Sequence, residues 1–351
     1  MLPAPKPDRR LAPESLPFRA RAYPGRDGDP DPTLRGLSEP LVTVVTPVYN
    51  GEEHLAECME SVVGQTYANW EYVVVDNCSK DRTPEIVERF ARSEPRIRYE
   101  RHEEFVDVVR SHNRSFRSAV GPDSVYCKVV GADDWLYPEC LSRMVEVAER
   151  HPDVGVVGSY RLAGSRVDLA GIPYGESTEP GRSVVAKSLQ GSGRRRLVVT
   201  GSPSALLLRS RFVRARDPFY DETMRHADTD AAYWVLMQSD FGFVHQVLTF
   251  FRESERSESS VSGRLGSWRP ELIRRLLRYG PSVLSPEDYR RELRNEVETY
   301  ARWFLRYRIR RHRQRDIWDY QRHAVELMKA DVGDDVESQR AFRILRLLTR
   351  W

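Results

Sequence analysis

The stretch VYCKVVGADDW, residues 125–135, decides both the expected fold and the expected site. It opens with a short apolar run, Val125–Val130, which is typical of a buried strand. A Gly-Ala corner follows, and two adjacent carboxylates, Asp133 and Asp134, come next. Ligands of open α/β sheets bind at the carboxyl ends of the strands, and carboxylate oxygens suit a hard divalent cation. The stretch therefore predicts a metal site at a strand end, with a solvated turn as the alternative.

Three further strands are predicted ahead of this stretch, with helical segments between them. The strands are expected at Leu41–Thr46, Trp70–Val75 and Ile97–Tyr99, and the helices at Glu52–Gln65, from Thr83 onward, and at Val108–Val120. The order β-α-β-α-β-α-β argues for a parallel, doubly wound α/β sheet. Right-handed connections bring the loops after the strands to one edge. We therefore expect one crevice, lined by Thr46–Asn50, Asp76–Asp81 and Asp133–Trp135.

The chain divides further by composition. Residues 1–40 are rich in Pro and Arg, lack hydrophobic periodicity and predict an extended arm. Residues 265–351 contain helical patterns only and carry 20 Lys and Arg against 13 Asp and Glu. Two polar segments, Arg161–Arg196 and Ser254–Gly263, are expected to be loops.

Composition excludes several classes of protein. The net charge of +3 over 351 residues gives no indication of nucleic-acid binding. The four cysteines match no zinc spacing, so free thiols in a reducing compartment are expected. The sequence contains neither a signal-peptide pattern at its start nor a run of 18 apolar residues. We expect a cytoplasmic protein, or one peripheral to a membrane.

The crevice residues favour a nucleoside diphosphate. Aromatic and polar side chains such as Tyr49 and Thr46 can hold a base, and carboxylates such as Asp76 can accept hydrogen bonds from ribose hydroxyls. A cation on Asp133 and Asp134 would neutralise the diphosphate. The sequence contains neither GxGxxG after its first strand nor GxxxxGK[ST], which disfavours dinucleotide and P-loop sites.

Two long blocks, Thr43–Thr83 and Ser111–Leu141, resemble the family 2 glycosyltransferases of the GT-A fold. The resemblance continues more weakly through Thr200–Ser210 and His226–Met237. It implies a transferase domain at residues 41–264, with a nucleotide-binding half at 41–135 and an acceptor-binding half at 136–264. Residues 265–351 would form a basic helical C-terminal region.

The resemblance also implies roles for individual residues. The donor nucleotide would be bound by Thr46, Pro47, Tyr49, Asp76, Asn77, Asp133 and Arg252, and the metal, Mn²⁺ or Mg²⁺, by Asp134 and Asp133. Two positions depart from the family pattern. Gly131 stands where the family's DxDD motif has its first acid, and Asn77 stands where a second acid is common.

The base that deprotonates the acceptor is implied at the start of a later helix, where the family often has Glu-Asp. Ala227-Asp228 corresponds here, so Asp228 is the candidate. Asp230 is its near rival, and Asp221 and Glu222 are weaker ones. A helix N-cap is the structural alternative for Asp228, because Asp favours that position.

The resemblance thus implies an inverting, metal-dependent transfer of a sugar from a UDP- or dTDP-sugar to a hydroxyl acceptor. The acceptor would be a saccharide, a lipid-linked sugar or a small molecule, as in polysaccharide, glycolipid or secondary-metabolite glycosylation. The alternative is a non-catalytic scaffold with a degenerate transferase fold, which Gly131 and Ala227 favour. A nucleotidyltransferase would need a basic Gly-rich loop after the first strand, and PVYNGEEH, residues 47–54, is not one.

The end of the chain, Gln339–Trp351, has the spacing of an amphipathic basic helix. Its apolar stripe consists of Phe342, Leu345, Leu348 and Trp351. The stripe could pack on the chain's own helices, form a subunit contact, or lie on an anionic membrane. We predict that it is covered in a folded homo-oligomer.

Overall fold

The computed structural model describes residues 39–169, 172–191, 201–253, 258–309 and 315–349. Most of the predicted N-terminal arm, residues 1–38, therefore lies outside the described residues. From Pro40 onward the chain forms one unit.

A single mixed sheet organises this unit. Its strands are β1 (Val42–Val48), β2 (Trp70–Asp76), β3 (Ile97–Arg101), β4 (Tyr126–Val129), β5 (Trp135–Leu136), β6 (Val154–Ala163), β7 (Arg166–Asp168), β8 (Thr178–Glu179), β9 (Leu206–Arg209) and β10 (Asp240–Phe251). The order is β3-β2-β1-β4-β9-β6-β10-β5, with β7 beside β6 and β8 beside β10. Strands β1 to β4 are parallel, as predicted, whereas β9 runs antiparallel to both β4 and β6.

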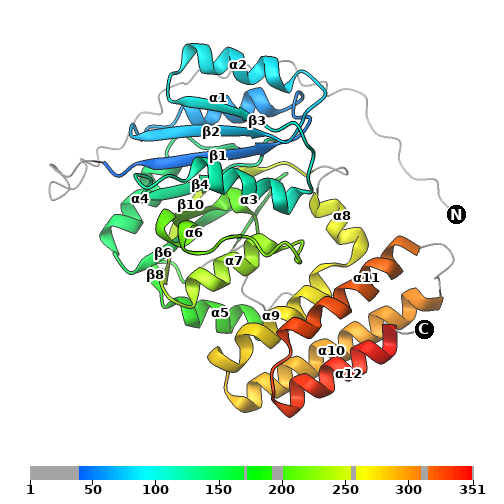
Figure 1. Cartoon of the computed structure of the whole chain (residues 1–351). Coiled ribbons are helices and arrows are strands. Elements are labelled where there is room, and N and C mark those ends of the chain that lie inside the picture. Colours follow the sequence, from blue (N-terminus) through cyan, green and yellow to red (C-terminus); the bar gives the residue numbers. More distant parts are fainter. Residues whose placement is uncertain (1–38, 170–171, 192–200, 254–257, 310–314, 350–351) are drawn as a thin grey trace, which may run out of the picture. The chain divides into compact units, whose positions relative to one another are not determined.

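Helices cover both faces of the sheet, because its strands are apolar on both sides. In β2, Val73 and Val75 face one core cluster and Tyr72 and Val74 the other. One face packs against α1 (Leu55–Val63), α2 (Thr83–Ser93) and α4 (Cys140–Arg150). The other packs against α3 (Val108–Ala119), α5 (Gly181–Leu189), α6 (Ser210–Ala215) and α7 (Ala227–Leu236). The predicted doubly wound arrangement is confirmed (Figure 1).

Two segments expected to be loops contain regular structure. The first includes β7, β8 and α5, and the second contributes to α8 (Glu258–Leu265). Helix α5 begins at Gly181, where a Cβ would lie 2.0 Å from the carbonyl oxygen of Ser239. Glycine therefore allows α5 to pack closely against this backbone. The exposed residues of the helix, such as Arg182, account for the polar character of the segment in the sequence.

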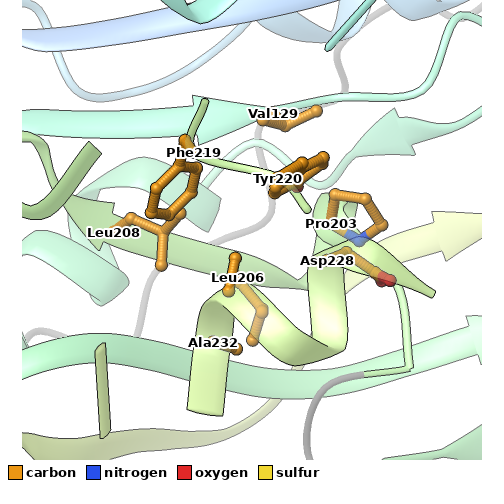
Figure 2. Close-up of a pocket in the computed structure, with 9 residues that line it drawn as sticks. Val129, Pro203, Leu206, Leu208, Phe219, Tyr220, Asp228 and Ala232 are labelled. Carbon is orange, nitrogen blue, oxygen red and sulfur yellow. The ribbon is translucent and has the colours of Figure 1, made fainter. Parts of the chain in front are cut away.

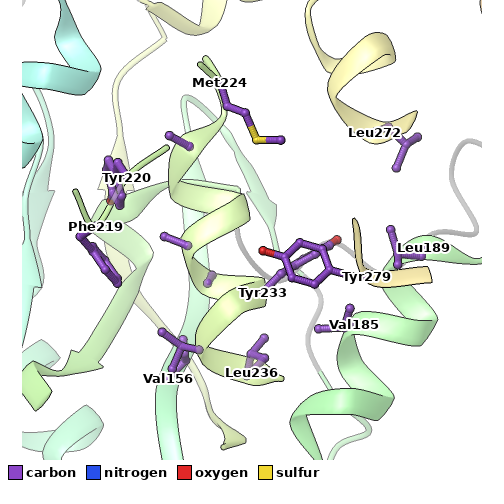
Figure 3. Packing of buried hydrophobic residues seen from close by; sticks show 14 of the residues in the cluster. Val156, Val185, Leu189, Phe219, Tyr220, Met224, Tyr233, Leu236, Leu272 and Tyr279 are labelled. Atoms are coloured by element: carbon purple, nitrogen blue, oxygen red, sulfur yellow. The ribbon is translucent and has the colours of Figure 1, made fainter. Parts of the chain in front are cut away.

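The C-terminal helices share a core with the α/β part of the chain. They are α9 (Trp268–Val283), α10 (Pro286–Ile309), α11 (Arg315–Leu327) and α12 (Val336–Thr349), and they pack on one another (Figure 1). Helix α9 lies against α7, where the rings of Tyr233 and Tyr279 meet edge-on with centroids 5.8 Å apart (Figure 3). Leu272 of α9 belongs to the same buried cluster as Leu236 of α7. The C-terminal region therefore has no separate core.

Helix α12 covers its apolar stripe within the chain. Phe342 and Leu345 are buried, and Leu348 packs on the same core. Burial of these residues needs no second subunit, contrary to our expectation, whereas Leu347 on another face is 59% exposed. Arg350 and Trp351 lie outside the described residues. None of the described helices is both long and apolar enough to span a membrane.

Ion pairs fix α9 to the α/β part of the chain. The Arg278 guanidinium lies 2.8 Å from Asp230 of α7, 3.0 Å from Asp221 and 2.6 Å from Asp331. Asp230 is fully buried and also accepts a hydrogen bond from Arg216 at 3.1 Å. A buried carboxylate needs such partners, because its desolvation is costly.

We predict that Arg278→Met destabilises the chain by about 1–3 kcal/mol, because it removes one hydrogen-bonding partner from buried carboxylates that keep others, such as Arg216. Chemical denaturation followed by circular dichroism measures this loss. Arg322→Met, at an exposed position on α11, is the control and should change stability little. Equal effects of the two substitutions would contradict the importance of the ion cluster.

Candidate active site

The two predicted metal ligands converge at the end of β4. The chain turns at Gly131, whose carbonyl oxygen accepts a hydrogen bond from the Asp134 amide at 3.0 Å. A Cβ at position 131 would lie 3.1 Å from Asp134 Oδ2 and 3.2 Å from Asp133 Oδ1. Glycine thus leaves room for both carboxylates to approach the same point. The departure from the family pattern at this position is sterically consistent with the two acids.

Asp134 is buried and held from two sides. The Ser204 hydroxyl donates to its Oδ2 at 2.6 Å, and the backbone amide of Arg252 donates to its Oδ1 at 3.1 Å. Burial, together with the neighbouring charge of Asp133, raises the pKa of Asp134 to about 7. A bound cation would lower the pKa of Asp134 again, because it favours the ionised form of both acids.

The donor set fits a hard divalent cation. Two adjacent carboxylates can supply part of an oxygen shell, which substrate phosphate completes in many Mg²⁺ sites. Among the described residues, no group of three or more His, Cys, Asp or Glu side chains could hold a metal. When bound, the cation would neutralise charge on a diphosphate.

Arg252 lies beside the acid pair. Its Nε donates to the Asp133 carbonyl oxygen at 3.1 Å, and its Nη2 lies 2.6 Å from Glu57. The guanidinium also sits 5.4 Å from the ring centroid of Trp135. These contacts hold the positively charged guanidinium of Arg252 next to the two carboxylates. This is the place where we expected Arg252 to contact a diphosphate.

Three of the expected nucleotide-binding side chains are directed into the protein. The Thr46 hydroxyl bonds to the Tyr72 hydroxyl at 2.8 Å in the core. Asp76 accepts from the Ser79 amide and the Tyr99 hydroxyl, each at 2.8 Å. All three expected residues are buried, so Thr46 and Asp76 present no free side-chain oxygen to the crevice in this structure.

The third buried side chain is Asn77, and its contacts explain why an amide stands here in place of an acid. Its Nδ2 donates to the carbonyl oxygen of Val106 at 2.7 Å, and its Oδ1 accepts from the Val106 amide at 3.0 Å. A carboxylate could accept but could not donate. Asn77 therefore clamps the loop that follows β3.

That loop carries an aromatic side chain that was not predicted from the sequence. Phe105 is 58% exposed and lies against Tyr49, which is 48% exposed, with ring centroids 4.7 Å apart. Half-buried Pro47 is close by in the chain, at the end of β1. An exposed ring pair can stack on a nucleobase. The only signal in the sequence is a Phe among acidic residues, EEFVD.

Asp228 occupies the first turn of α7 and is half-buried. It lines a small cavity of about 10 Å³ together with Val129, Pro203, Leu206, Leu208, Phe219, Tyr220, Ala231 and Ala232 (Figure 2). Burial raises the pKa of Asp228, although the charges of His226, Arg275 and His112 oppose the shift. A carboxylate with a raised pKa is a better proton acceptor than an ordinary Asp once it is ionised.

The rival bases are engaged elsewhere. Asp230 is fully buried in the ion cluster with Arg278 and also accepts from the Tyr279 hydroxyl at 2.9 Å. Asp221 belongs to the same cluster. Glu222 accepts from Arg110 and Asn113, each at 3.1 Å. Of the four acids, Asp228 has no cationic side chain within hydrogen-bonding distance among the described residues.

Residues 43–213 match the family model described as glycosyl transferase family 2. Residues 43–213 thus form a glycosyl transferase family 2 domain. The match includes the crevice and the acid pair but ends before Asp228.

Curated relatives support the same assignment. Glycosyltransferase GlyG of Streptococcus pneumoniae is 32% identical over 121 residues, which cover 34% of this chain and 39% of the relative. The uncharacterized glycosyltransferase EpsJ of Bacillus subtilis is 30% identical over 128 residues, 36% of each protein. The chain matches less than half the length of these relatives.

Solved structures confirm the fold beyond the matched domain. TarS 1–349 of S. aureus in complex with UDP-GlcNAc has a TM-score of 0.57 at 16% identity, with 88% of this chain and 90% of that chain covered. The mannosyltransferase PcManGT of Pyrobaculum calidifontis, in complex with GDP-Man and Mn²⁺, has a TM-score of 0.51 at 14% identity, with coverages of 88% and 87%. The predicted GT-A architecture is confirmed.

The acid pair generates a prediction about metal dependence. Asp134→Asn should remove the Mn²⁺-dependent part of UDP-sugar binding, because a neutral amide is a poor ligand for a hard cation. Stability without ligand should be kept or raised, since a buried carboxylate beside Asp133 is lost. Thermal shift with and without Mn²⁺ and donor measures both effects. A variant that still responds fully to Mn²⁺ would contradict the assignment.

Proposed function

We propose that the protein is an inverting, metal-dependent glycosyltransferase that moves a sugar from a nucleoside diphosphate to a hydroxyl acceptor. The observation that carries the proposal is the turn at Pro203–Ala205. Pro203 lines the cavity of Asp228, while the adjacent Ser204 donates to Asp134. The proposed base and the proposed diphosphate site thus flank a single turn, as a direct displacement requires.

The proposed reaction assigns one task to each group. The Asp228 carboxylate accepts the proton of the acceptor hydroxyl, whose oxygen attacks the anomeric carbon. The bond between this carbon and the diphosphate breaks on the opposite face, so the configuration inverts. Arg252 favours the departing diphosphate through its positive charge. Asp133 and Asp134 would hold Mn²⁺ or Mg²⁺ against the same phosphates.

We place the nucleobase on the Tyr49 and Phe105 rings, with Pro47 beside them. UDP- and dTDP-sugars are the proposed donors, and the complexes of TarS with UDP and UDP-GlcNAc support the choice of a UDP-sugar. Asp76 and Asn77 would act through the backbone and the loop that they hold. The proposed acceptor is a saccharide, a lipid-linked sugar or a small molecule, encountered in the cytoplasm or at a membrane surface.

A scaffold without catalytic activity is the competing proposal. Gly131 no longer favours it, because a Cβ there would crowd both acids. A screen of UDP-, dTDP- and GDP-sugars by thermal shift, followed by assay of released nucleoside diphosphate, separates the two proposals. Stabilisation by a donor with metal-dependent release supports the transferase. The absence of both responses for every donor would support the scaffold.

The base assignment yields a matched pair of substitutions. Asp228→Asn should lower turnover by about 10²-fold or more and leave donor affinity unchanged, because only proton transfer is lost. Asp230→Asn should instead lower stability, since it disturbs the ion cluster. Steady-state kinetics and thermal denaturation of both variants measure the contrast. Normal turnover of Asp228→Asn would exclude Asp228 as the base.

The raised pKa of Asp228 also predicts a pH dependence. The base must be ionised, so turnover should fall as the pH is lowered through a value above the ordinary range of Asp. This acid limb should disappear from the residual turnover of Asp228→Asn. The pH profile of kcat for both proteins measures it.

A further inference from the structure

Helix α7, which carries Asp228, begins without a cap of its own. The residue at its N-cap position, His226, makes no side-chain hydrogen bond to the helix. Another helix binds the two backbone amides that come just before α7. Glu271 of α9 accepts from the Arg225 amide through Oε1 and from the His226 amide through Oε2, each at 2.8 Å.

Glu271 is itself held in place. Its side chain is 2% exposed, and the Tyr320 hydroxyl of α11 donates to Oε1 at 3.2 Å. One turn before it, Ser267 lies 3.0 Å from Nε2 of His226. Glu271 therefore holds the backbone two and three residues ahead of Asp228, and Ser267 holds the His226 ring.

From these contacts we infer that Glu271 is a positioning residue for the proposed base, Asp228; the inference rests on the proposed function. A negative charge at the start of α7 stabilises the helix through its dipole. The two short hydrogen bonds set where the helix begins, and hence where the Asp228 side chain projects. The C-terminal helices thereby contribute to the acceptor side of the site without touching substrate.

Proton transfer depends steeply on such placement. A displacement of about 1 Å at a reacting group can lower the rate by about 10²-fold. Glu271→Gln keeps the volume but offers one acceptor oxygen for two amides. We expect kcat to fall about 10-fold or more, while the KM for the donor stays unchanged because the nucleotide site is remote from α9. Glu271→Asp keeps the charge and should retain more turnover than Glu271→Gln.

The experiment compares these variants with Glu292→Gln. Glu292 is a buried carboxylate of α10 that accepts from the Gly191 amide at 3.2 Å, so it matches Glu271 in burial and in substitution but not in its contact with α7. Steady-state kinetics are measured with a UDP-sugar and an acceptor. Amide hydrogen exchange of residues 225–231 reports on the start of α7 without any need for activity.

Faster exchange at residues 225–231 and lower kcat in Glu271→Gln alone would support the proposal. Normal kcat in that variant, or equal losses in Glu271→Gln and Glu292→Gln, would overturn it. If the wild-type chain transfers no sugar from any donor, the proposed function fails. The exchange comparison then decides by itself whether Glu271 holds the start of α7, and unchanged exchange would overturn the inference.

Discussion

The arrangement of the helices around α7 depends on the burial of Asp230. A carboxylate without exposed surface must be neutralised locally, and its partners come from two directions, Arg216 after α6 and Arg278 of α9. Because one of these cations belongs to a C-terminal helix, α9 has to pack on α7. That packing brings Glu271 to the start of α7 and unites the C-terminal helices with the transferase core.

The parts of the fold that could be predicted from sequence are those set by local pattern. Short β-branched runs such as Leu41–Thr46 are apolar on both faces of a strand, so they are stable only as buried strands. The helices between them act as crossover connections, which make neighbouring strands parallel. The acids after β4 follow directly from that topology. Residues Asp133 and Asp134 are adjacent in sequence, so one corner brings both to the strand end.

Other features depend on contacts that sequence order does not encode. The direction of a side chain at a strand end is fixed by register, which turns Thr46 toward Tyr72 and away from the crevice. Asn77 contacts Val106 and Glu271 contacts Arg225, each across tens of residues of chain. A polar residue far along the chain from its partner looks like any other surface residue in the sequence. The contact of Phe105 with Tyr49 is hidden for the same reason.

The contact between Glu271 of α9 and the backbone just before α7 has a consequence for recombination involving this chain. Recombination between the genes of two relatives near residue 264 would separate Glu271 from the amides whose hydrogen bonds it accepts. It would also separate Arg278 from Asp230. In the recombinant protein, the two partners of each contact would come from different parent sequences. The segment from Arg216 to Asp331 should therefore be inherited as a block, whereas residues 41–135 take part in neither contact.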